Sequence, residues 1–165
     1  MLRYAAEEET RMVLNARRVL ADCKHALELL HEESRPASFR VLWVAGVALV
    51  RAVGHVLQKV DGRDEVVKAA VAAVYASWKS NRSGNAIFWG FIEEERNQIL
   101  KQYEIGYFAG SVDVVASGQA HSLDDHLFCP ITDGPFAGED CRDILEQAIG
   151  WWEQQLAAVE AEARG

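Results

Sequence analysis

The scarcity of proline constrains this chain more than any other feature of its sequence. Only three prolines occur in 165 residues, at positions 36, 130 and 135, and the stretch from Ala37 to Cys129 contains none. Proline interrupts helix interiors because it lacks a backbone N–H group and its ring clashes with the preceding turn. The long proline-free stretch therefore permits several long helices in succession.

Apolar residues repeat at helical spacing through this part of the chain. The same kind of spacing predicts helices over 7–33, 39–60, 65–79 and 85–103. The second of these segments is apolar on nearly every side, so we expect it at the centre of the fold. In the first segment the steps alternate between four and three residues, which keeps one face towards a partner: Met12, Ala16, Leu20, Cys23, Leu27 and Leu30.

Residues at the ends of these segments are typical of helix caps. Ser38 and Asp64 are candidate N-caps of the second and third helices, because their side-chain oxygens can accept hydrogen bonds from free backbone N–H groups. Gly62 suits the left-handed backbone position that follows a helix. Gly46, inside the second helix, leaves room for the close approach of a neighbouring element.

The last third of the chain has a different character. β-Branched and aromatic residues with intervening glycines predict a strand within 104–116, and 127–132 is its expected partner. The polar residues 117–126 between them are expected to be exposed. A last helix begins at Glu139 or Asp140 and runs to about residue 163, with an inward face of Ile144, Leu145, Ala148, Trp151 or Trp152, Leu156 and Val159.

Together these segments predict a mainly all-α fold in a single domain, residues 1–165. It comprises a four-helix bundle over 7–104, a hairpin and loop over 105–138, and a C-terminal helix over 139–163. Five tryptophans lie among apolar neighbours at helical spacing, which indicates packing in the core or in a dimer interface: Trp43, Trp78, Trp89, Trp151 and Trp152.

Composition restricts the surroundings in which the chain can work. Its 25 acidic and 17 basic side chains leave a net charge of −8, so a broad basic surface for nonspecific nucleic-acid binding is excluded. The longest apolar run, residues 41–50, is about half of what a bilayer crossing requires. The N-terminus has no hydrophobic signal core. We expect a cytoplasmic protein that does not associate with membranes.

One motif in the fourth predicted helix carries functional information. Arg96 and Asn97 are followed by Lys101 and Tyr103. This pattern resembles that of the HEPN superfamily, a set of all-α domains many of which are RNA-cleaving toxins. The family pattern is an arginine, four to six residues, and a histidine, and one toxin branch has Arg-x4-His-x-Tyr. In this chain Lys101 occupies the histidine position.

The second predicted helix adds to the resemblance. Phe39-Arg40 followed by Trp43, and then residues 51–58, are similar to the corresponding helix of bacterial HEPN-like proteins, so the likeness covers about residues 7–104. It implies a homodimer with a shared cleft that cleaves RNA without a metal or other cofactor, in a toxin, defence or stress system. It also implies a protein partner: an antitoxin, or a nucleotidyltransferase that modifies the tyrosine at position 103.

The residue types of the motif suit RNA cleavage, with one departure. The guanidinium of Arg96 can stabilise the charge that develops on the phosphate, and Asn97 can orient the reacting groups. An imidazole normally transfers the protons because its pKa lies near neutrality. A lysine at position 101 has an ordinary pKa of about 10.4 and is a poor base. The alternative is therefore a catalytically inactive dimeric scaffold that binds a protein or a small molecule.

Other interpretations of single residues remain open at this stage. Arg96 can instead form an ion pair with Glu93, one helical turn away, and Tyr103 can be a half-buried aromatic against the hairpin. Arg51 and His55, one turn apart on the second helix, either supply the missing imidazole to the fourth helix or form a semi-buried pair between helices.

A third, weaker interpretation is a metal-binding module. The side chains between positions 121 and 141 include types that bind zinc, but none has a familiar ligand spacing, so we expect no metal site: His121, Asp124, Asp125, His126, Cys129 and Cys141. The chain has three cysteines and no CxxC pair, which makes a disulfide framework unexpected.

Overall fold

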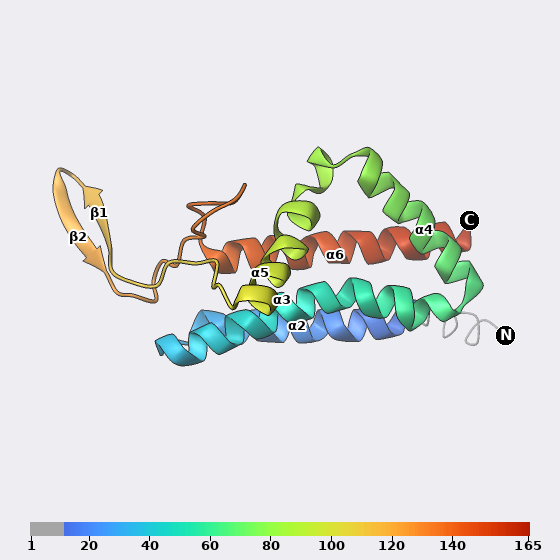
Figure 1. The fold of residues 1–165 in the computed structure, drawn as a ribbon, viewed down its shortest axis with the longest axis horizontal. Helices are drawn as coiled ribbons and strands as arrows, with labels where there is room; N and C mark the ends of the chain where they lie inside the picture. The colour runs from blue at the N-terminus through green and yellow to red at the C-terminus, as the bar shows by residue number, and fades with distance from the viewer. Residues whose placement is uncertain (1–11) are drawn as a thin grey trace.

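The computed structural model describes residues 12–165, so the start of the first predicted helix, residues 7–11, lies outside the described residues. The fold is mainly helical with one small hairpin, as predicted. Figure 1 shows α2 and α3 as an antiparallel pair, with α6 lying alongside them and α4 and α5 on the same side as α6. The helices are α2 (Leu14–Glu32), α3 (Pro36–Lys59), α4 (Glu65–Ser80), α5 (Glu94–Gln102) and α6 (Cys141–Arg164).

The first turn of α2 is capped by a residue from a distant part of the chain. Asp61 belongs to a short 3-10 turn, η1 (Asp61–Arg63), which joins α3 to α4. Its carboxylate accepts hydrogen bonds from the backbone N–H groups of Asn15 (3.2 Å) and Ala16 (2.8 Å) and from the Asn15 side chain (2.7 Å). A buried carboxylate thus satisfies the backbone donors that the helix leaves free.

Helix α3 lies at the centre, as its apolar composition predicted. It begins at Pro36, so the prediction that Ser38 caps a helix starting at Phe39 is wrong. Proline fits the first helical position because that residue needs no N–H donor and its φ angle is already helical. Gly46 does admit a close neighbour: a Cβ atom there would lie 2.9 Å from Cδ2 of Leu145 in α6.

The stretch Pro36–Arg63 is also long and apolar enough to cross a membrane, judged by length and composition alone. The core helix of a soluble protein passes the same test. In this structure α3 packs against α2 and α6. The large side chains of its buried face are Phe39, Trp43, Val47, Val50, Val53 and Leu57.

The start of α4 follows the prediction and the end of α3 does not. Asp64 caps α4 by accepting hydrogen bonds from the backbone N–H groups of Val66 (2.8 Å) and Val67 (3.1 Å). Gly62 was predicted in a left-handed conformation, but among the described glycines only those at 118, 134 and 138 have a positive φ. The chain leaves α3 through a 3-10 turn instead, and this turn places Asp61 under α2.

The fourth predicted helix is divided into three pieces. A 3-10 turn, η2 (Ser83–Asn85), precedes a π-helical turn, η3 (Phe88–Ile92), and α5 begins only at Glu94. In the π-helical turn the N–H of Glu93 donates to the carbonyl of Phe88 at 3.1 Å. The wider turn allows Phe88, Phe91 and Ile92 all to be buried. Helix α5 ends before Tyr103, whose φ of 54° is left-handed.

The hairpin forms from different residues than predicted. Strand β1 (Val112–Ala116) pairs antiparallel with β2 (Gln119–Leu123), so β2 lies in the stretch expected to be a loop. Ser117 and Gly118 between them both have positive φ angles, which suits a two-residue turn. Residues 127–132 instead form single bridges, Tyr107 with Ile131 and Pro130 with Asp140. Figure 1 shows the hairpin projecting from one end of the helical bundle.

The core is continuous and rich in aromatic side chains. All the residues predicted for the inward face of α6 are buried, including both Trp151 and Trp152. Trp78 and Phe88 pack against this pair, with ring centroids 4.7 Å apart for Trp78 and Trp151 and 5.3 Å for Phe88 and Trp151. The prediction of tryptophans packed in the core is confirmed for this cluster.

Candidate functional site

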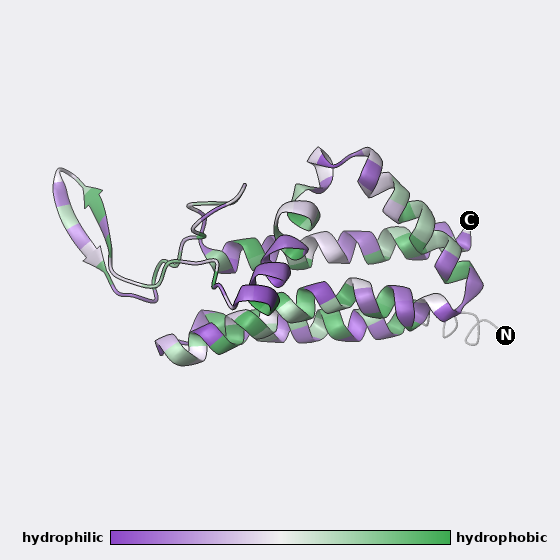
Figure 2. Ribbon diagram, viewed as in Figure 1, coloured by the Kyte–Doolittle hydropathy of each residue, from purple (hydrophilic) through white to green (hydrophobic). Residues whose placement is uncertain are grey.

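Helix α5 carries Arg96, Asn97 and Lys101 of the predicted motif, and Tyr103 follows its last residue. The helix packs on α3, and its buried residue is Ile99. Figure 2 shows α5 as a predominantly hydrophilic segment among more apolar helices. Residues 95–98 of this helix are half-buried, whereas Glu94 and residues 100–102 are exposed. The surroundings of Arg96 and Asn97 therefore decide what the motif can do.

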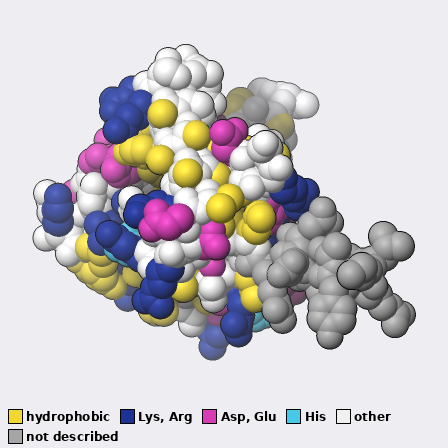
Figure 3. Space-filling view, turned by 90° about the vertical axis from the view of Figure 1, so that its right-hand side faces the viewer, with side chains coloured by type: hydrophobic (Ala, Val, Ile, Leu, Met, Phe, Trp, Pro, Cys, Tyr) yellow, Lys and Arg dark blue, Asp and Glu magenta, His cyan; other side chains and the backbone are white. Residues whose placement is uncertain are grey.

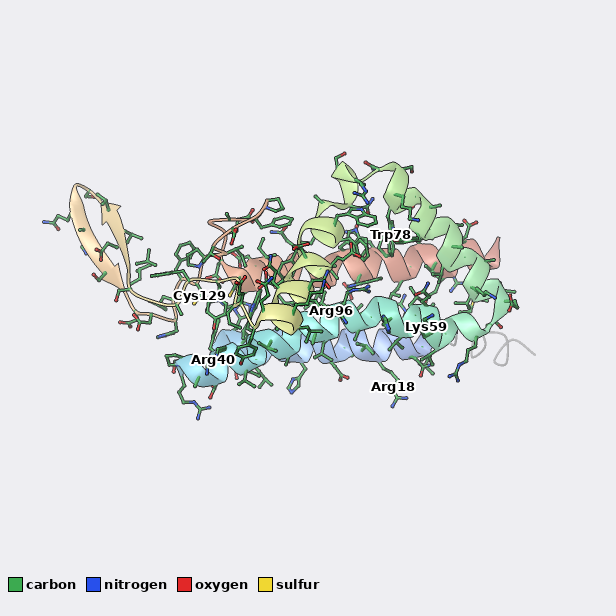
Figure 4. All side chains as sticks on the ribbon, viewed as in Figure 1. Arg18, Arg40, Lys59, Trp78, Arg96 and Cys129 are labelled. Carbon is green, nitrogen blue, oxygen red and sulfur yellow. The ribbon has the colours of Figure 1, made fainter. Side chains whose placement is uncertain are left out.

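Arg96 lies half-buried beside Asn97 near the middle of the molecule (Figure 4). Its guanidinium Nη1 donates to Oδ1 of Asn97 at 3.3 Å. Within residues 12–165, no carboxylate lies within ion-pair distance of this guanidinium. The alternative that Arg96 forms an ion pair with Glu93 is therefore wrong. A partly desolvated cation without a counter-charge is suited to receive an anion.

Lys101 and Tyr103 are both exposed. Tyr103 has 62% of its surface accessible, so the alternative that it is half-buried against the hairpin is wrong, because the hairpin projects away from α5. The left-handed backbone at Tyr103 lets its N–H donate to the carbonyl of Ile99 at 3.0 Å and closes the helix. Leu100, between the motif residues, is also 62% exposed. This end of α5 therefore presents an apolar and a phenolic side chain to solvent beside a lysine.

Carboxylates gather beside α5 in a polar cavity of about 450 Å³. Glu94, Glu95, Glu104 and Asp133 line it, whereas Arg96 and Lys101 do not. Glu95 accepts a hydrogen bond from the backbone N–H of Gly106 at 3.0 Å. Burial raises the pKa of Glu95, and this hydrogen bond opposes the rise. The carboxylates and the two cations of α5 therefore occupy different surroundings.

Arg51 and His55 do not join α5. His55 is exposed and makes no hydrogen bond or ion pair with another described residue. Arg51 is half-buried, also without such a partner, and lines a second cavity between α3, α4 and α6. Neither interpretation of this pair holds: the imidazole is not bonded to the Arg96–Asn97 pair, and the two side chains do not bridge helices by hydrogen bonds.

The loop before α6 contains a polar cluster that the sequence did not reveal. The last helix was predicted to begin at Glu139 or Asp140; Asp140 is its N-cap and accepts from the N–H of Arg142 (3.0 Å), and it also accepts from the N–H of Cys129 (2.9 Å). The Arg142 guanidinium binds the same carboxylate and donates to the carbonyls of His126 (3.0 Å) and Leu127 (2.9 Å). Burial opposes ionisation of Asp140, yet these hydrogen bonds lower its pKa overall.

Two of the cysteines belong to this cluster. The backbone N–H of Cys141 donates to the carbonyl of Cys129 at 2.9 Å, and the Cys129 thiol donates to the carbonyl of Asp125 at 3.6 Å. The neighbouring Cys141 thiol and Arg142 lower the pKa of Cys129, whereas the Cys129 thiol and burial raise the pKa of Cys141. Within residues 12–165 the structure brings no three His, Cys, Asp or Glu side chains into a metal-binding group, so the metal-module interpretation finds no ligand set there.

The surface charge is mixed on the end of the molecule formed by the start of α4 and the end of α6. Figure 3 shows Lys and Arg side chains interspersed with Asp and Glu on this face. A face of this kind offers no continuous positive field to a polyanion. This end of the molecule therefore offers no broad binding surface for RNA.

Comparisons with known proteins add no family to this geometry. No protein-family model, curated protein or solved structure matches the chain.

Proposed function

We propose that this chain is a HEPN-like, metal-independent RNA endonuclease that acts as a homodimer through α5. The observation that carries the proposal is the half-buried Arg96 guanidinium, which is hydrogen-bonded to Asn97 and has no carboxylate partner among the described residues. A guanidinium stays charged and can bind two phosphate oxygens at once. It is therefore suited to stabilise the transition state of phosphodiester cleavage.

A second copy of the chain would complete the site. Leu100 and Tyr103 are exposed beside Lys101 on a helix that is otherwise polar. Pairing of two α5 helices would cover these side chains and would bring the Arg96 of each protomer to one cleft. Tyr103, accessible and at the end of the helix, is the candidate for modification by a partner nucleotidyltransferase.

The chemistry must accommodate Lys101 in place of histidine. The 2′-oxygen of the ribose forms a bond to phosphorus and the bond to the 5′-oxygen breaks, which yields a 2′,3′-cyclic phosphate and a free 5′-hydroxyl. Arg96 stabilises the negative charge on the non-bridging oxygens, and the Lys101 ammonium donates a proton to the leaving 5′-oxygen. Solvent hydroxide removes the proton of the 2′-hydroxyl, so the rate is expected to rise with pH.

Cleavage of RNA in EDTA by purified wild type, Arg96→Ala, Lys101→Ala and Lys101→His tests the proposal. Removal of a transition-state charge partner costs about a hundredfold or more in rate, so Arg96→Ala is expected to be almost inactive. Lys101→His is expected to be faster than wild type at neutral pH, because an imidazolium, whose pKa lies near neutrality, gives up its proton to the leaving oxygen more readily than an ammonium does. Arg18→Ala, on the exposed face of α2, serves as the matched control and retains activity.

The same experiment distinguishes the alternative. An inert wild type with an active Lys101→His identifies an inactive scaffold that keeps the geometry of a nuclease. If all variants are inert, or if Arg96→Ala cleaves as fast as wild type, the nuclease proposal is wrong. Light scattering of wild type against Leu100→Asp tests the dimer, since a charge at that position would separate two α5 helices.

A further inference from the structure

A cavity of about 440 Å³ lies apart from the Arg96–Asn97 pair, between α3, α4, η3 and α6. Small-molecule sites commonly have volumes of about 300–1,000 Å³ and walls that are mostly apolar with a few polar groups. The buried rings of Trp78, Phe88 and Trp152 form its floor, and the half-buried Val71 and Tyr75 stand in its wall. The size and the apolar lining, with the Tyr75 ring, therefore suit an organic molecule with a flat apolar body.

The fold explains why the space exists. After η1, α4 leaves α3 and crosses to pack on α6, so the two sequence neighbours diverge (Figure 1). Trp152 of α6 lies directly against α3 and forms the floor of the cavity between α3 and α4. A Cβ atom at Gly54 would be only 2.8 Å from Cη2 of Trp152, so only glycine permits this approach.

Two residues that line the cavity, Arg51 and Trp152, each carry a donor without a partner among residues 12–165. The Trp152 indole N–H is buried without a hydrogen bond, and the Arg51 guanidinium has neither a hydrogen bond nor an ion pair. The two side chains are close together: Arg51 Nη1 lies 3.6 Å from the point at which a Gly54 Cβ would stand, and the Trp152 ring lies 2.8 Å from it. An arginine next to a buried aromatic surface is typical of sites for anions with apolar bodies.

The remaining charges around the cavity are mainly positive. Lys68 and Lys79 line it, against a single carboxylate, that of Glu93. Lys68 pairs with the exposed Glu65 at 3.2 Å, and Lys79 lies over the Tyr75 ring at 4.6 Å. The chain as a whole has a net charge of −8. At this cavity, however, the three cations Arg51, Lys68 and Lys79 produce a positive local potential that favours the binding of anions.

We propose that this cavity binds a small organic anion with a flat apolar body. Its anionic group binds the Arg51 guanidinium, with Lys68 and Lys79 adding to the field, and its apolar body packs on Val71 and Tyr75, the half-buried apolar side chains of the cavity wall. The site shares no residue with the Arg96 motif, so this proposal does not depend on whether the protein cleaves RNA.

Fluorescence titration with two probes tests both halves of the proposal. 1-Anilinonaphthalene-8-sulfonate has the anion and the apolar body, and N-phenyl-1-naphthylamine has nearly the same body without the charge. The wild type is expected to bind the sulfonate at a stoichiometry of one, at least tenfold more tightly than the neutral probe. Circular dichroism of each sample establishes that the fold is intact, because the sulfonate also binds partly unfolded proteins.

Two variants and their matched controls locate the site. Arg51→Gln is expected to weaken binding of the sulfonate about tenfold without changing binding of the neutral probe. Ala72→Phe, at an exposed position in the cavity wall, is expected to abolish binding of both probes. The controls are Arg18→Gln, an exposed arginine on α2, and Ala73→Phe, an exposed neighbour that does not line the cavity; each is expected to bind as wild type does.

Several results would overturn the proposal. Equal affinity for the two probes, or an unchanged affinity in Arg51→Gln, shows that no anion is recognised. Unchanged binding in folded Ala72→Phe places the probe elsewhere on the protein. A similar loss in Ala73→Phe or Arg18→Gln shows that the binding is nonspecific.

Discussion

The Asp140 carboxylate is stabilised in its ionised form by several hydrogen bonds. Its carboxylate accepts from two backbone N–H groups and from the guanidinium of Arg142, which in turn fixes two carbonyls of the preceding loop. These contacts tie the loop to the first turn of α6. Because they form in the folded state, they favour the ionised carboxyl there, and the pKa of Asp140 lies below its ordinary value.

This lowered pKa makes a prediction about stability and pH. The unfolded chain binds a proton at Asp140 near pH 4, and the folded chain does so only at lower pH. The stabilisation is therefore fully present above pH 4 and is lost as the pH falls through the lowered folded pKa. Asp140→Asn is expected to lower the free energy of unfolding by about 1.5–3 kcal/mol at pH 7, and by less as the pH falls below 4.

Urea denaturation between pH 7 and pH 2.5 measures this difference. Asp143→Asn is the matched control, because Asp143 is an exposed carboxyl in the same first turn of α6 without a side-chain hydrogen bond among the described residues. Its stability is expected to follow that of the wild type at every pH. A difference for Asp140→Asn that stays constant with pH contradicts the argument.

At the scale of elements, glycine decides how closely α6 approaches α3. Leu145 and Trp152 of α6 face Gly46 and Gly54 of α3, and in both places an added Cβ would lie within 3 Å of the opposite side chain. The two contacts differ in their capacity to yield. Leu145 can change rotamer, whereas Trp152 is a rigid indole that is 1% exposed and packed against Trp78 and Phe88.

Gly54→Ala is therefore expected to destabilise the protein even though alanine is the better helix former. The gain in helix propensity is about 1 kcal/mol, and overpacking against Trp152 costs about 1–3 kcal/mol. Gly150→Ala is the matched control, since no atom lies within 4 Å of a Cβ at that position of α6; it is expected to stabilise by up to about 1 kcal/mol. Thermal unfolding of both variants and the wild type measures these changes in stability. A stabilised Gly54→Ala would contradict the packing argument.

At the scale of the whole molecule, the hairpin is separate from the helical body. Nearly all side chains of β1 and β2 are exposed, and the two strands pair with each other. The ends of the hairpin are adjacent because Val112 pairs with Leu123. The helical core is continuous without it, which locates the stability of the molecule in the helices and in the loop around Asp140.

Replacement of residues 112–123 by a short Gly-Ser linker is thus expected to change the free energy of unfolding by less than about 1 kcal/mol, since no large apolar area is lost. Denaturant unfolding of the shortened chain measures this change. A loss of several kcal/mol would mean that the hairpin contributes to the core. The same variant in the RNA-cleavage assay reports whether the hairpin takes part in substrate binding.

Local sequence patterns predicted those features that depend on neighbours in the chain. Helical spacing predicted the main helices and the inward face of α6, and Asp64 was identified as a cap because capping is a local interaction. The prediction failed where the same segment can adopt either of two local backbone conformations. Ser117-Gly118 closes a tighter hairpin than the long polar loop that we expected, and the run of aromatic residues at 88–91 adopts a π-helical turn in place of a regular helix.

The sequence by itself determined the mainly helical architecture, the central place of α3 and the presence of Arg96 and Asn97 on one helix. Only the tertiary structure decided which groups meet across large separations, such as Asp61 under α2 and Arg51 beside Trp152, and that Arg96 has no carboxylate partner within residues 12–165. The physical reason is the separation in sequence over which the responsible interactions act. Helix formation depends on side chains three or four residues apart, whereas a cavity or an unpaired charge depends on how whole elements pack.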